Sequence, residues 1–299
     1  MRRSSTVGTV YEFDPKTSVA VISRDHFGDI QSDELFTILG QSGVIILRGC
    51  INTVEEFSAF VKKHSSRLSL DPARSMVGGA AQLVDAGTHA VGLHCENGNS
   101  PFWPDLTWFY CHRAPTQGSQ TTICNGADVY WHLSEGCRNF FADAPIRYRR
   151  RVAGDKWRRL VCHYRPDINN PSLVSFHDLL KLTQHDPHTT ITHDAESDDI
   201  HYAYVVSAIQ TSSFSALPAF ANSILGPSYN YEKPIIDMAD GREIPEAYLD
   251  EIETITQAHT HPIGWQDHDI AMIDNRRVMH GREEILDMNR QIFNALSYR

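Results

Sequence analysis

Short stretches rich in β-branched and aromatic residues recur through the middle and the end of the chain. Gly, Pro, Asn or Asp residues stand at their boundaries. Runs of this composition between turn residues are typical of strands. The pattern therefore predicts strands within residues 81–87, 107–115, 120–126, 146–154, 268–282 and 290–299.

Two segments near the start have helical patterns with recognisable ends. In "SDELFTILGQS" we expect Asp33 to cap the first turn, and Gly43 then separates the helix from the apolar run 44–47, which has the length of a buried strand. In "TVEEFSAFVKKHS", Thr53 and Glu56 have the spacing of a capping box, in which each side chain bonds the other residue's backbone N–H. This second segment therefore predicts another helix.

Further helices are predicted where the apolar residues do not fit strands. These helices do not alternate regularly with the strands, and the chain has neither G-x-G-x-x-G nor a P-loop, so a parallel doubly wound sheet is disfavoured. The sequence instead predicts a mainly β core, a jelly roll or barrel with surface helices, in one domain over residues 1–299. The additional helices are expected within 127–141, 179–182, 219–225 and 244–259.

Charge and cysteine content exclude several classes of protein. The 299 residues carry a formal net charge of −10, whereas binding to a nucleic-acid backbone needs clustered Lys and Arg. The one basic run, 147–151, alternates partly with apolar residues and is interpreted as the solvent face of a strand. No C-x-x-C pair and no apolar run of membrane-spanning length occurs. We expect a cytoplasmic protein that binds neither nucleic acid nor membrane.

The segment "GLHCENGNSPF" carries candidate chemistry. His94, Cys95 and Glu96 are compatible with a metal-binding turn, a cysteine active site or a strand with polar residues. Among the 16 histidines, only His94 has a carboxylate two positions later. On a strand, residues i and i+2 point to the same side, so His94 and Glu96 would face one point. An imidazole and a carboxylate on one face are two thirds of the facial triad that holds Fe(II) with open positions.

The third ligand of such a triad should come from a distant strand. His280, in "MIDNRRVMHGREE", follows an apolar stretch and precedes a glycine, which places it at a strand end. It is the best candidate in the chain for the missing ligand. For His280 taken alone, a surface histidine at the end of a strand is the alternative interpretation.

Three segments in order, "HCE", "PDLTWFYCHRAPTQGSQTTICNG" and "DNRRVMHGREE", resemble the Fe(II)/2-oxoglutarate-dependent oxygenases of the taurine dioxygenase and clavaminate synthase-like group. The last segment is also similar to carbapenem synthase, a member of that group. The resemblance spans about residues 35–299, and the stretch 165–235 carries little of the pattern. It implies a distorted double-stranded β-helix, a cupin-like jelly roll with flanking helices. We expect the stretch 165–235 to be a lid insertion.

The resemblance also implies roles for individual residues. Thr121 and Arg290 match the hydroxyl and the guanidinium that hold the distal carboxylate of 2-oxoglutarate, since a planar guanidinium can donate two parallel hydrogen bonds. Arg282 is predicted to contact the cosubstrate near the iron. The residues that match the iron ligands are His94, Glu96 and His280.

Two positions depart from the common pattern of this group. Most members use Asp as the carboxylate ligand, whereas this chain has Glu96, as clavaminate synthase-like members do. In "WQDHD", His268 replaces a common glycine, which affects the geometry expected for that turn.

The function implied is that of an enzyme that uses Fe(II), 2-oxoglutarate and O2. It would oxidise an unactivated C–H bond of a small amino-acid-derived or specialised-metabolite substrate and release succinate and CO2. Hydroxylation is the default outcome; desaturation, cyclisation and epimerisation use the same site. One alternative is a protein-modifying oxygenase, which should have an open groove. Another is a non-enzymatic cupin-like metal-binding protein, which needs no arginine for 2-oxoglutarate.

Overall fold

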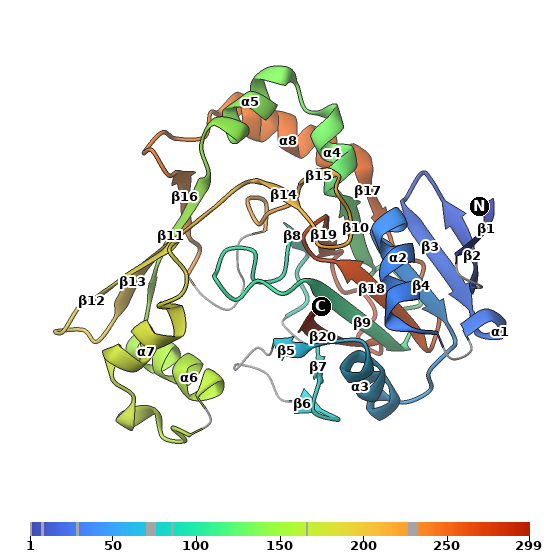
Figure 1. Cartoon of the computed structure of the whole chain (residues 1–299), viewed down its shortest axis with the longest axis horizontal. Helices are drawn as coiled ribbons and strands as arrows, with labels where there is room; N and C mark the ends of the chain where they lie inside the picture. The colour runs from blue at the N-terminus through green and yellow to red at the C-terminus, as the bar shows by residue number, and fades with distance from the viewer. Residues whose placement is uncertain are drawn as a thin grey trace.

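The computed structural model describes residues 2–6, 9–27, 30–69, 76–84, 87–165, 167–226 and 232–299. Within these ranges the largest sheet has ten strands, in the order β1-β2-β3-β4-β18-β9-β20-β7-β6, and β5 also pairs with β20 (Figure 1). Its strands are β1 (Arg2–Thr6), β2 (Thr9–Asp14), β3 (Val19–Ser23), β4 (Val44–Arg48), β5 (Arg67–Ser69), β6 (Met76–Val77), β7 (Ala81–Leu83), β9 (Leu106–Arg113), β18 (Asp269–Asp274) and β20 (Gln291–Tyr298).

A second sheet packs against one face of the large one. Its four strands run in the order β17-β10-β19-β8, and every neighbouring pair is antiparallel. Ile123 and Val278 of this sheet belong to the same buried cluster as Phe109, Ala271 and Ile292 of the large sheet. The two sheets therefore enclose an apolar layer between them. The strands of the second sheet are β8 (Val91–His94), β10 (Thr121–Asn125), β17 (Thr260–Pro262) and β19 (Val278–Arg282).

Helices α2 (Ser32–Ser42) and α3 (Val54–Lys63) cover the opposite face of the large sheet. On β18 the side chains alternate between the two layers. Ile270 and Met272 pack under the helices, whereas Ala271 and Ile273 face the second sheet. Since successive strand residues point to opposite faces, the four apolar residues 270–273 of this one strand fill both layers.

A third sheet with two helices stands beside this body, at the left of Figure 1. Its strands run in the order β12-β13-β11-β16, and a cluster that includes Val152, Trp157 and Leu179 packs the helices against it. It contains much of the predicted lid. The elements of this region are β11 (Ile146–Val152), α6 (Gly154–Tyr164), the 3-10 helix Pro171–Leu173, α7 (Phe176–Thr183), β12 (Thr189–His193), β13 (Ile200–Val206) and β16 (Ile235–Met238), and the separate pair β14 (Ile209–Thr211) and β15 (Pro218–Phe220) follows β13.

The remaining helices are α1 (Arg24–Phe27), α4 (Gly126–His132), α5 (Glu135–Asp143) and α8 (Glu246–His259). The last three contribute to a separate apolar cluster beside β11 and β13. None of the helices in the described ranges combines the length and the apolar character needed to cross a lipid bilayer. Sheets thus form the core as the sequence predicts, but the helices are extensive enough that the fold is a mixed α/β arrangement of several sheets.

Most of the predicted elements are confirmed, including the strands within 107–115, 120–126 and 146–154. Gly43 ends α2 in the left-handed conformation, with φ 83°. Thr53 caps α3 by accepting a hydrogen bond from the backbone of Glu56 at 3.1 Å.

Three local predictions were wrong. Asp33 does not cap α2, because the helix already begins at Ser32 and Asp33 lies in its first turn. The stretch predicted as one helix at 127–141 is interrupted between α4 and α5 at Leu133 and Ser134. No helix forms at 219–225, where β15 and a series of bends occur instead. There the burial of Phe220 in the core outweighs local helix propensity.

Candidate metal centre and active site

Strand pairing brings two of the predicted ligands together. His94 ends β8, His280 lies on β19, and the two are partners in the β8–β19 register. Their ring centroids are 4.5 Å apart. Next to His280, Gly281 permits the close approach of the strands, since a Cβ there would lie 2.6 Å from the carbonyl oxygen of Val91. The register of the sheet therefore creates the histidine pair.

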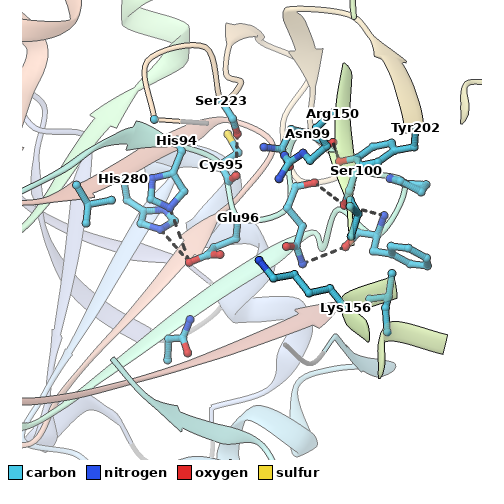
Figure 2. A pocket seen from close by; sticks show the side chains of 18 of the residues that line it. His94, Cys95, Glu96, Asn99, Ser100, Arg150, Lys156, Tyr202, Ser223 and His280 are labelled. Atoms are coloured by element: carbon cyan, nitrogen blue, oxygen red, sulfur yellow. Dashed lines mark hydrogen bonds and ion pairs between the residues drawn. The ribbon is translucent and has the colours of Figure 1, made fainter. Parts of the chain in front are cut away.

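Glu96 completes the group from the turn after β8. The expectation that His94 and Glu96 share one strand was wrong, because β8 ends at His94. The turn nevertheless directs the carboxylate to the same point (Figure 2). Glu96 Oε1 lies 3.4 Å from His280 Nε2 and 3.9 Å from His94 Nε2.

These three side chains fit a divalent metal ion. One ligand atom from each residue lies within 4.8 Å of the other two, and this is the one such group of His, Cys, Asp and Glu found in the described part of the chain. Two imidazoles and one carboxylate on one side of an ion are the ligand set of a non-haem Fe(II) centre with open positions. His94, Glu96 and His280 thus meet as the sequence predicts, and we call them the triad.

The protonation states of the triad suit metal binding. His94 Nδ1 lies 2.8 Å from the carbonyl oxygen of Gly92 and donates to it, which leaves Nε2 as the ligand atom. Burial lowers the pKa of His280, so its ring is neutral at pH 7. Burial by itself would raise the pKa of Glu96, but the hydrogen bonds and charges of His280 and His94 hold it well below its usual range. Neutral imidazoles and an ionised carboxylate are the forms that bind metals.

Asn275 fixes the turn that carries Glu96, and sequence reasoning missed it. Its Oδ1 accepts from the Glu96 backbone N–H at 2.9 Å, and its Nδ2 donates to the Glu96 and Pro104 carbonyls at 3.0 and 2.9 Å. The side chain is fully buried. Nothing local in "IDNRRV" distinguishes this amide, since its partners lie more than 170 residues earlier in the chain.

Cys95 is a packing residue and not a nucleophile. Its side chain is 1% exposed and belongs to an apolar cluster. Burial raises the pKa of the thiol well above its ordinary value, whereas a nucleophilic cysteine needs the thiolate. Its backbone is held on both sides, by the carbonyl of Asn222 at 3.1 Å and by the hydroxyl of Ser223 at 3.0 Å. The cysteine active site considered for this turn is therefore excluded.

The triad lies in the wall of a cavity of about 260 Å³. Thr121, Arg282 and Arg290 line the same cavity. Thr121 faces Arg282 across the β10–β19 ladder, and its Oγ1 accepts from Trp265 Nε1 at 3.2 Å. The three residues predicted to bind 2-oxoglutarate thus share one cavity with the three predicted iron ligands.

The two arginines differ in what already holds them. Arg282 Nη2 donates to the carbonyls of Gly87 and His89 at 3.0 and 2.7 Å. Arg290 is 8% exposed, and its Nε and Nη2 have no hydrogen-bond partner among the described residues. Burial, followed by the charge of Arg282, lowers the pKa of Arg290 to about 10, so the group remains charged at neutral pH. A buried guanidinium in this state is ready to bind an anion.

The remaining wall of the cavity comes from the third sheet and its helices. Apolar and aromatic side chains dominate it, and Tyr202 donates from its hydroxyl to the carbonyl of Asn99 at 3.0 Å. Two cations, Arg150 and Lys156, also line it (Figure 2). The residues that this region contributes are Arg150, Val152, Lys156, Trp157, Leu160, Tyr164, Leu179, Thr183, Thr189, Ile191, Ile200 and Tyr202.

With this site in place, the relation to known proteins can be stated. A model of the taurine catabolism dioxygenase TauD, TfdA family matches residues 12–296. The chain belongs to the TauD/TfdA family. It is an Fe(II)- and 2-oxoglutarate-dependent dioxygenase, and the triad is its iron site. No curated protein shows significant similarity to the sequence of this dioxygenase.

Solved structures of low sequence identity share the fold. A candidate α-ketoglutarate-dependent 2,4-D dioxygenase from Burkholderia xenovorans is 16% identical, with a TM-score of 0.59 and 96% of each chain covered. PvcB from Pseudomonas aeruginosa is 12% identical, with a TM-score of 0.60 over 97% of this chain and 90% of that one. AAD-2, in complex with Mn(II) and N-oxalylglycine, is 12% identical, with a TM-score of 0.58 and 96% of each chain covered.

Proposed function

We propose that this dioxygenase oxidises an unactivated C–H bond of a small amino-acid-derived or specialised-metabolite substrate. Hydroxylation is the default outcome, and desaturation, cyclisation or epimerisation would use the same site. The observation that carries the proposal is the shared cavity, which the triad lines together with Arg282, Arg290 and the mostly apolar wall of the third sheet. A cavity of about 260 Å³ suits the cosubstrate and a small molecule better than a segment of a folded protein.

In this proposal Arg290 binds the distal carboxylate of 2-oxoglutarate, and Thr121 contributes its hydroxyl. Support comes from the burial of both side chains, at 8% and 4% exposure, and from the charge that Arg290 keeps at neutral pH. Arg282 contacts the cosubstrate nearer the iron, and its bonds to Gly87 and His89 limit its movement. The second arginine also strengthens the positive potential that attracts the dianion.

Bound Fe(II) and 2-oxoglutarate supply the activation of O2 and the electrons released when the keto acid becomes succinate and CO2. The chain's own residues would hold the metal ion, orient the reactants and exclude water. His94 Nε2, the neutral ring of His280 and the ionised carboxylate of Glu96 would hold the ion. Asn275 keeps the Glu96 turn in place, and the apolar wall keeps water away from the reacting carbon.

The finer architecture belongs to the same proposal. The two packed sheets around the triad are taken as the distorted double-stranded β-helix that membership of the family implies. Residues 1–299 form a single oxygenase domain, in which about 165–235 acts as a lid over the substrate. The similarity of "DNRRVMHGREE" to carbapenem synthase and a cytoplasmic location remain predictions.

Succinate release measured by mass spectrometry tests the proposed function. Protein, Fe(II), O2 and 2-oxoglutarate are incubated with and without a library of small amino-acid-derived compounds. Wild type should release succinate only with Fe(II), and at least one compound should accelerate release and itself change in mass or, if it is epimerised, in stereochemistry. His280→Ala should abolish release and weaken Fe(II) binding. His259→Ala, at the end of α8 and not among the residues that line the cavity, is the control.

Three results would contradict the proposal. Equal succinate release by His280→Ala and wild type would remove the triad from the reaction. Iron binding without any succinate release would favour the non-enzymatic metal-binding alternative. Oxidation of a peptide panel, with no small molecule accepted, would favour a protein-modifying oxygenase.

A further inference from the structure

A segment of backbone covers the edge strand that leads into the metal site. Residues 222–226 follow β15 and lie against β8, the outer strand of the second sheet. The Cys95 N–H donates to the carbonyl of Asn222 at 3.1 Å. A Cβ on Gly226 would lie 2.4 Å from the carbonyl oxygen of Gly92, so only glycine allows the two backbones to come this close. We call residues 222–226 the strap.

Ser223 joins the strap to the residue that precedes the carboxylate ligand. Its Oγ donates to the carbonyl of Cys95 at 3.0 Å, and the residue is 1% exposed. Its N–H donates to the hydroxyl of Tyr148 at 3.0 Å. In Figure 2, Cys95 lies between Ser223 and Glu96. Both hydrogen bonds are buried, and they are therefore electrostatically stronger than the same bonds would be in water.

β11 of the third sheet presents Tyr148 to the strap. Side chains alternate along this strand, and Arg147 and Arg149 both bind Asp237 on its outer face, at 2.8 and 2.7 Å. Tyr148, between them, is fully buried on the inner face. The basic run is thus a solvent face only at alternate positions. For Arg150 that prediction was wrong, because the residue is 9% exposed and lines the cavity.

The backbone around Glu96 is held by two separate parts of the fold. Asn275, directly after β18, bonds the N–H and the carbonyl of Glu96 itself, at 2.9 and 3.0 Å. Ser223 of the strap bonds the carbonyl of the preceding residue, Cys95. Release of either contact would let the turn move and would change the 3.4 Å distance between Glu96 Oε1 and His280 Nε2. Groups that orient a metal ligand commonly change metal affinity tenfold or more.

We propose that Ser223, anchored by Tyr148, is a positioning residue for Glu96. By fixing the Cys95 carbonyl, it keeps the carboxylate at the point where the three ligand atoms of the triad meet. The strap lies within residues 165–235, so part of the predicted lid then serves the metal site as well. The inference concerns the iron site and not the substrate, so it can fail while the proposed function stands.

Co(II) binding measures this role without turnover, because Co(II) accepts the same imidazole and carboxylate ligands as Fe(II). Co(II) is titrated calorimetrically into the metal-free protein, and His280→Ala identifies the heat that belongs to the triad. Ser223→Ala should weaken this binding about tenfold. Ser42→Ala is the matched control and should bind Co(II) like wild type. Ser42 is equally buried and donates to the Ile38 carbonyl at 2.9 Å, but it does not line the cavity.

The Glu96→Ala background separates positioning from general destabilisation. If Ser223 acts through Glu96, adding Ser223→Ala to Glu96→Ala should change the Co(II) affinity by less than about twofold. A loss of stability would instead weaken binding by the same factor in both backgrounds. Titrations extend to millimolar Co(II), so that binding by His94 and His280 alone is measured. Tyr148→Phe should weaken Co(II) binding about threefold with the same dependence on Glu96, and it replaces Ser223→Ala if that variant does not fold.

The positioning role is overturned if the folded Ser223→Ala and Tyr148→Phe proteins bind Co(II) as wild type does, or if their loss persists in the Glu96→Ala background. A similar loss in Ser42→Ala would also overturn it, because the affinity would then follow stability alone. Fe(II)-dependent succinate release is recorded for the same preparations. Its absence in wild type would refute the proposed function instead, and the comparison of Co(II) affinities would still decide the role of Ser223.

Discussion

Replacing Arg290 with Met should weaken 2-oxoglutarate binding without destabilising the free protein. Arg290 is 8% exposed, and burial, followed by the charge of Arg282, lowers its pKa to about 10. A fall of this size corresponds to roughly 3 kcal/mol against the charged form in the folded state. Because the folded pKa of this base is below the unfolded value, the cost is fully present at neutral pH. It is relieved only as pH rises through about 10.

The carboxylate of the cosubstrate would offset that cost by pairing with the guanidinium. Loss of one partner of a buried pair costs about 3–5 kcal/mol, so the dissociation constant for 2-oxoglutarate should rise by on the order of a hundredfold or more. Met keeps the volume of the aliphatic stem and removes the charge. The melting temperature of the unliganded variant should therefore equal or exceed that of wild type.

Calorimetric titration of 2-oxoglutarate into the anaerobic Fe(II) protein measures the affinity, and thermal unfolding without ligand measures stability. Arg113→Met removes an exposed arginine that is paired in register with Gln291, and it should change neither quantity. The reasoning is refuted if Arg290→Met binds 2-oxoglutarate within about threefold of wild type. If Arg282→Ala shows the large loss instead, Arg282 and not Arg290 holds the distal carboxylate.

Three other outcomes are expected. Reactions run in high chloride should yield no chlorinated product by mass spectrometry, because Glu96 occupies the position on the metal that a halide would need. A product of the native protein that carries the chlorine isotope pattern would show that Glu96 leaves the iron. Burial raises the pKa of Asp274 to about 6, so between about pH 6 and pH 4 the folded state takes up a proton that the unfolded state does not. Wild type should therefore gain about 2 kcal/mol relative to Asp274→Asn as pH falls from 7 to 4, and equal denaturation curves at both pH values would contradict this. Proteolysis within 165–235 should slow when Fe(II), 2-oxoglutarate and substrate are present together, whereas equal rates would count against a mobile lid.

Local features of the sequence determined most of the elements and two of the three metal ligands. The helix that starts at Thr53, the break at Gly43 and the strands that became β9, β10 and β18 follow from composition, capping and turn residues. These features act over a few residues, so they can be recognised without the fold. The His94–Glu96 spacing is local in the same way, although a turn and not a strand brings the two together.

Tertiary structure decided which distant groups meet and which charges are buried. His280 joins the triad because β19 pairs with β8 in one register, and the sequence does not state that register. Asn275 acts on a turn that lies far earlier in the chain. Arg150 looked like its neighbours in the basic run, and only the placement of β11 beside the cavity turned it inward. Burial depends on how whole elements pack. Arginines that look alike in the basic run therefore either form ion pairs at the surface or line the cavity.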